Sequence, residues 1–103
     1  MKALTRMTTL LNYNLLALLT QKIEKCVLDN VAICVSLSGS CVTCRNRMNI
    51  EDYEVDTEHL YLNDNNFEVH INFDNSTSIE YDDYIDECFT IMQGSMKLNL
   101  YFM

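Results

Sequence analysis

Residues 67–73 read FEVHINF, in which apolar and polar side chains alternate. This alternating pattern indicates that most of the chain forms β-strands. The side chains of the apolar face are Phe67, Val69, Ile71 and Phe73. Apolar residues at every second position are typical of a strand that buries one face and exposes the other. The tetrapeptide NDNN at 63–66 predicts a hairpin loop, so residues 58–62 are expected to form the antiparallel partner strand.

Two further hairpins are predicted by turn residues between alternating segments. Residues 31–38 alternate cleanly, and the turn at 38–40 leads to a return strand over residues 41–47. Residues 89–93 and 96–102 are expected to pair around Gly94-Ser95, because glycine in the first position suits a type II′ turn.

Two acidic stretches are ambiguous. Residues 48–57 show no decisive period, and residues 78–87 fit either a strand followed by a turn or a short helix.

The N-terminal part predicts a helix over residues 4–28, because its apolar residues recur every three or four positions. Thr8 or Thr9 is a candidate cap, and Asp29-Asn30 ends the helix. The chain is therefore predicted to be one α+β domain over residues 1–103. Its N-terminal amphipathic helix (residues 1–30) would pack on an antiparallel meander of five or six strands (residues 31–103).

Charge is divided unevenly along the 103 residues, whose formal net charge is −8. Residues 1–50 carry six Lys or Arg and two acidic residues, whereas residues 51–103 carry one Lys and thirteen acidic residues. This distribution excludes a general nucleic-acid binder, which needs a basic surface, so no direct contact with nucleic acid is expected.

Five cysteines, with no signal peptide or long apolar run, predict a cytoplasmic protein with reduced thiols and no membrane contact.

The acidic half also contains tyrosines, which are enriched at protein interfaces. Carboxylates on one face of a strand repeat about every 6.8 Å, a spacing of the same order as that of backbone phosphates. An acidic face of this kind would fit a groove lined with Arg and Lys; the alternative is an ordinary solvated surface. The candidate partner-binding residues are Glu54, Asp56, Glu58, Glu80, Tyr81, Asp82, Asp83, Tyr84 and Asp86.

The runs YEVDTEH and IEYDDYIDE, the small size and the short C-terminal strand resemble small acidic anti-CRISPR proteins of phages and mobile elements of Gram-positive bacteria. The resemblance is one of type and covers residues 51–103. It implies a non-enzymatic inhibitor that occupies the DNA-binding cleft of a CRISPR effector nuclease in the bacterial host cell. The basic N-terminal half departs from an all-acidic mimic and suggests a homodimer contact.

Three alternatives come from other features. Cys41 and Cys44 form a single CxxC pair, which would organise a zinc- or thiol-dependent domain only if further ligands joined it. A homo-oligomeric structural protein would pair its basic and acidic halves between copies. The helix followed by VAICVSLSG also resembles a small Sm-like barrel, although RNA binding would need more basic residues.

Because HExxH, GxSxG and phosphate-binding glycine motifs are absent, no enzymatic activity and no cofactor are expected.

Overall fold

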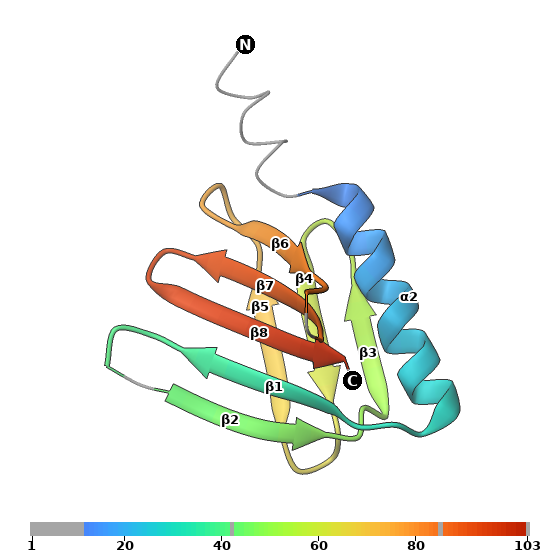
Figure 1. Cartoon of the computed structure of the whole chain (residues 1–103). Helices are drawn as coiled ribbons and strands as arrows, with labels where there is room; N and C mark the ends of the chain where they lie inside the picture. The colour runs from blue at the N-terminus through green and yellow to red at the C-terminus, as the bar shows by residue number, and fades with distance from the viewer. Residues whose placement is uncertain (1–11, 42, 85, 103) are drawn as a thin grey trace.

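The computed structural model describes residues 12–41, 43–84 and 86–102 (Figure 1). Helix α2 (Tyr13–Asp29) is capped at its N-terminus by Asn12, whose side-chain oxygen accepts the backbone N–H groups of Asn14 and Leu15 at 3.0 and 3.2 Å. Asn30 ends the helix in the left-handed conformation, with φ at 57°. The end predicted from the sequence is thus confirmed, whereas residues 4–11 and the caps expected there lie outside the described residues.

The described residues after the helix form eight strands, and all pairings among these strands are antiparallel. Their bounds are β1 (Ile33–Ser38), β2 (Thr43–Met48), β3 (Asp52–Val55), β4 (His59–Asn63), β5 (Glu68–Asn72), β6 (Ser78–Asp82), β7 (Glu87–Gln93) and β8 (Met96–Phe102). The ambiguous stretches of the sequence contain β3 and β6, so residues 78–82 form a strand and not a short helix. The described residues between β6 and β7 are not helical either. Gly94 has a φ of 60°, as the predicted type II′ turn requires.

The strands form a five-stranded sheet in the order β2-β1-β8-β7-β6 and a three-stranded sheet in the order β3-β4-β5. The α+β prediction is confirmed, but two sheets replace the single sheet of five or six strands, and β1 pairs with β8 rather than following a simple meander. Helix α2 alone cannot cover the apolar faces of the eight described strands, and these strands form two layers that cover each other. The described strands of the two sheets share no hydrogen-bonded ladder, and the small Sm-like barrel is therefore not formed.

The core lies between the two sheets (Figure 1). Leu60 and Leu62 contribute from the three-stranded sheet, and Phe89, Leu98 and Leu100 from the five-stranded sheet, all with no exposed surface. These side chains occupy alternate positions of their strands, as the sequence period predicted. The polar residues between them consequently lie on the two outer faces.

Helix α2 closes one side of this two-layered core. It lies against β6 and β3, which are edge strands of the two sheets. Leu16, Leu19 and Ile23 are its buried residues. The helix therefore joins the two sheets, and it fixes the position of β6 and the acidic turn that follows it.

Candidate functional site

Five of the predicted partner-binding residues lie together at the β6–β7 end of the five-stranded sheet. We name this group the acidic corner; its members are Glu80, Asp82, Asp83, Tyr84 and Asp86. All five are exposed, and Tyr84 is 82% exposed. The carboxylate of Asp82 accepts the backbone N–H of Tyr84 at 2.8 Å, which helps to hold the turn in shape. The acidic corner thus combines charge with an exposed aromatic side chain.

A groove of about 550 Å³ borders the acidic corner on the outer face of the five-stranded sheet. Asp82, Tyr84 and Asp86 form one wall. The remaining lining residues come from β7 and β8: Cys88, Thr90, Lys97, Asn99 and Tyr101. The Thr90 hydroxyl donates to Oδ1 of Asn99 at 2.8 Å, so the floor is polar and internally hydrogen-bonded. The groove offers space beside the acidic corner for a partner side chain.

Tyr81 lies apart from the acidic corner, although it is adjacent in sequence. Its ring packs against Phe89 with centroids 4.7 Å apart, and its hydroxyl donates to Glu87 at 2.7 Å. Lys22 of α2 forms an ion pair with the same carboxylate at 2.7 Å. The hydrogen bond to Glu87, together with burial and nearby negative charge, raises the pKa of Tyr81 to about 12. The bond from Lys22, followed by that from Tyr81, lowers the pKa of Glu87. Tyr81 therefore helps to attach the helix.

Glu54, Asp56 and Glu58 lie on the other sheet, at β3 and the β3–β4 turn. Oδ1 of Asp56 accepts the backbone N–H groups of Glu58 and His59 at 2.7 and 2.9 Å. These two hydrogen bonds lower the pKa of Asp56. Because the outer faces of two packed sheets point in opposite directions, this turn does not share a surface with the acidic corner. The structure thus divides eight of the nine predicted residues between two surfaces, and Tyr81 belongs to neither of them.

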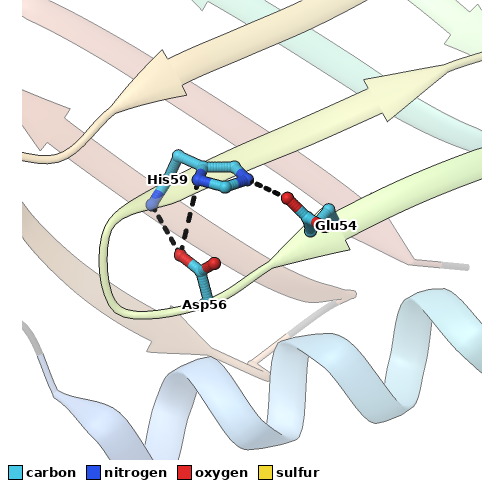
Figure 2. A group of neighbouring side chains, drawn as sticks. All are labelled: Glu54, Asp56 and His59. Carbon is cyan, nitrogen blue, oxygen red and sulfur yellow. Dashed lines mark hydrogen bonds and ion pairs between the residues drawn. The ribbon is translucent and has the colours of Figure 1, made fainter.

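His59 joins the second surface, although the partner-binding prediction did not include it. Figure 2 shows its ring between the two carboxylates, with Nε2 2.5 Å from Glu54 Oε1 and Nδ1 3.5 Å from Asp56 Oδ1. The ring of His70 on β5 meets His59 edge-on with centroids 5.6 Å apart. The sequence signal for this group is the spacing Glu54-x-Asp56-x-x-His59. The tight turn between β3 and β4 brings His59, at the start of β4, back beside Glu54 and Asp56.

The cysteines do not form a metal centre among the described residues. Cys41 and Cys44 are both exposed, and no described group of three potential ligands includes either of them. Burial raises the pKa of the Cys26 and Cys88 thiols, which disfavours their reactive thiolate forms. These observations give no support to a centre organised by Cys41 and Cys44.

Comparison with protein-family models, curated proteins and solved structures finds no match to this chain. The helix that the structure describes is not long and apolar enough to cross a membrane.

Proposed function

We propose that the protein is a non-enzymatic inhibitor that uses the acidic corner to bind a basic nucleic-acid-binding cleft of another protein. A CRISPR effector nuclease in the cytoplasm of a bacterial host cell is the partner that we favour. One observation carries the proposal: among the described residues, none of the four carboxylates of the acidic corner forms an ion pair with Lys or Arg, and Tyr84 beside them is 82% exposed.

The physical argument rests on the cost of that arrangement. Like charges held close together repel one another and oppose the compact state. Two cations, Lys97 and Arg45, line hollows beside Asp86, but they are outnumbered by the four carboxylates and, within the described part of the chain, form no ion pair with them. Arg and Lys side chains of a partner cleft would relieve this repulsion, and the charge would also accelerate the encounter. An exposed tyrosine adds a large contact area with few torsions to immobilise, a common property of interface residues. A surface that serves solubility alone does not need Tyr84.

The test is a competition for DNA. A labelled DNA duplex is bound to a purified, guide-loaded Cas9-type nuclease, and its fluorescence anisotropy is followed as the protein is added. We expect the protein to displace the DNA, and the double variant Asp82→Lys/Asp83→Lys to lose this effect. Asp52→Lys/Glu68→Lys changes the net charge equally on the outer face of the three-stranded sheet, and it should still compete.

Two results would contradict the proposal. Equal loss in both double variants would show that net charge, rather than the acidic corner, drives binding. Failure of the unmodified protein to displace DNA from a panel of such nucleases would remove this class of partner. Direct binding of the protein to the nuclease, measured without DNA, should also weaken between 0.1 and 1 M salt, because the Debye length falls from about 10 Å to about 3 Å.

A second candidate is self-association, which one observation favours. Arg45 and Arg47 are exposed on β2, an edge strand of the five-stranded sheet. Their charge complements the acidic corner of another copy. Sedimentation at low salt checks this candidate, since a monomer at high protein concentration would exclude it.

A further inference from the structure

The β3–β4 hairpin gathers two carboxylates and one imidazole on the outer face of the three-stranded sheet (Figure 2). One ligand atom from each of Glu54, Asp56 and His59 lies within 4.8 Å of the other two. Imidazole nitrogen and carboxylate oxygen are both common ligands of first-row transition-metal ions. The group therefore has the composition of a small metal site.

The backbone holds this group in position. Asp56 is oriented by the two N–H groups that its Oδ1 accepts, and its Oδ2 remains available. The side chain of His59 is 22% exposed and is packed against the ring of His70. The side chain of Glu54 is 66% exposed, which leaves it free to adjust. Two of the three groups are thus preorganised, and the third is adaptable.

The local charge favours a cation. Among the described residues, neither Glu54 nor Asp56 forms an ion pair with Lys or Arg; both are paired with His59 instead. The sequence has no Lys or Arg from Met48 to Met96 that would compete for this position. A bound divalent ion would relieve the repulsion between the two carboxylates.

We propose that Glu54, Asp56 and His59 bind one divalent transition-metal ion, such as Ni²⁺, Co²⁺ or Zn²⁺, with water at the remaining positions. The imidazole selects these ions over Mg²⁺ and Ca²⁺, which prefer oxygen ligands alone. Ligand atoms that share one ion at about 2.1 Å lie roughly 3 Å apart. Nδ1 of His59 and Oδ1 of Asp56 are 3.5 Å apart, close to that separation, so the ion binds at Nδ1. The exposed carboxylate of Glu54, which lies at Nε2, moves across to Nδ1 to complete the site. With three protein ligands at the surface, the ion exchanges readily with solvent.

The test is calorimetric titration of the reduced, tag-free full chain with NiCl₂. We expect saturable binding of one ion per chain. His59→Gln should weaken the affinity by about tenfold or more, since it removes a ligand. Asp56→Asn should weaken it similarly, while its amide oxygen still accepts the backbone N–H groups of the turn. His70→Phe is the matched control: it removes the other histidine of the chain but keeps an aromatic ring against His59, and it should bind Ni²⁺ as the unmodified protein does.

Three results would overturn the proposal. Unchanged affinity in His59→Gln would place the ion elsewhere, and absence of saturable binding would exclude the site. A thiolate-to-metal charge-transfer band on addition of CoCl₂ would identify cysteine ligands instead. Circular dichroism of each variant confirms that a lost site does not reflect a lost fold. None of these results bears on DNA competition, because the acidic corner lies on the other sheet.

Discussion

Ile23→Ala is the substitution that tests most directly how α2 joins the two sheets. Ile23 has no exposed surface and belongs to the helix that lies against both β6 and β3. Alanine keeps the helix propensity of this position or improves it, so helix formation itself is not impaired. Any loss of stability therefore measures the packing of the helix against the sheets.

The expected loss is large for a domain of this size. Full burial of an isoleucine side chain contributes about 1.5–3 kcal/mol, and the cavity left after truncation adds to the cost. We expect the free energy of unfolding to fall by about 3 kcal/mol, within the roughly 2–5 kcal/mol range for such changes. In a domain of about 100 residues, 1 kcal/mol shifts the melting temperature by about 4–8 °C. The variant should therefore melt at least about 12 °C lower.

Urea unfolding monitored by circular dichroism and by tyrosine fluorescence measures this loss, since the chain contains six Tyr and no Trp. Leu28→Ala is the matched control on the same helix, because Leu28 is 78% exposed. Its free energy of unfolding should stay within about 0.5 kcal/mol of the unmodified value. If Ile23→Ala were as mild as this control, the helix would not be packed as the structure shows.

Three further predictions concern a cap, an ion pair and a turn. Asn12→Ala should cost about 1 kcal/mol in urea unfolding, because it removes the acceptor for two N–H groups of the helix. Glu87→Gln should destabilise the protein at neutral pH. This difference should shrink as the pH falls below the ordinary glutamate pKa of 4.5, because the folded protein holds the pKa of Glu87 lower than that value. The same variant should lower the pKa of Tyr81 from about 12 towards 10.0, as absorbance titration of tyrosinate would show. Gly94→Ala should cost about 1 kcal/mol because its φ is 60°, whereas Gly39→Ala, with open space around it and no positive φ, should be nearly neutral.

The sequence predicted strands well where one face is buried and poorly where acidic residues dominate. In β5, buried Val69 and Ile71 alternate with exposed residues, and this is the period that the sequence displays. In β3, only Tyr53 and Val55 face inward, and the acidic residues between them disfavour strand formation. The position of β3 is decided by its pairing with β4, where Tyr53 lies opposite Leu62. Pairing between distant segments is not visible in a local pattern.

Alternation also explains which part of the candidate site was misjudged. Tyr81 lies between Glu80 and Asp82 on β6, so the strand period itself directs it to the opposite face. The sequence interpretation grouped these residues by closeness along the chain and not by parity. The division between two sheets has a different origin: the chain crosses from β5 to β6 without pairing them. Sequence alone shows which side chains share a face of one strand, but not which faces end on the same side of the molecule.

The separation of the two acidic surfaces has an electrostatic consequence. Packed sheets lie about 10 Å apart, and the outward side chains add to that distance. The Debye length at 0.1 M salt is also about 10 Å, so charges on the two outer faces scarcely sense each other under such conditions. A metal ion at Glu54, Asp56 and His59 would then leave docking through the acidic corner unaffected. At 0.01 M salt the Debye length is about 30 Å, and both surfaces contribute to the attraction of a basic partner. Added NiCl₂ should therefore slow association in low salt and have little effect on it at 0.1 M or above.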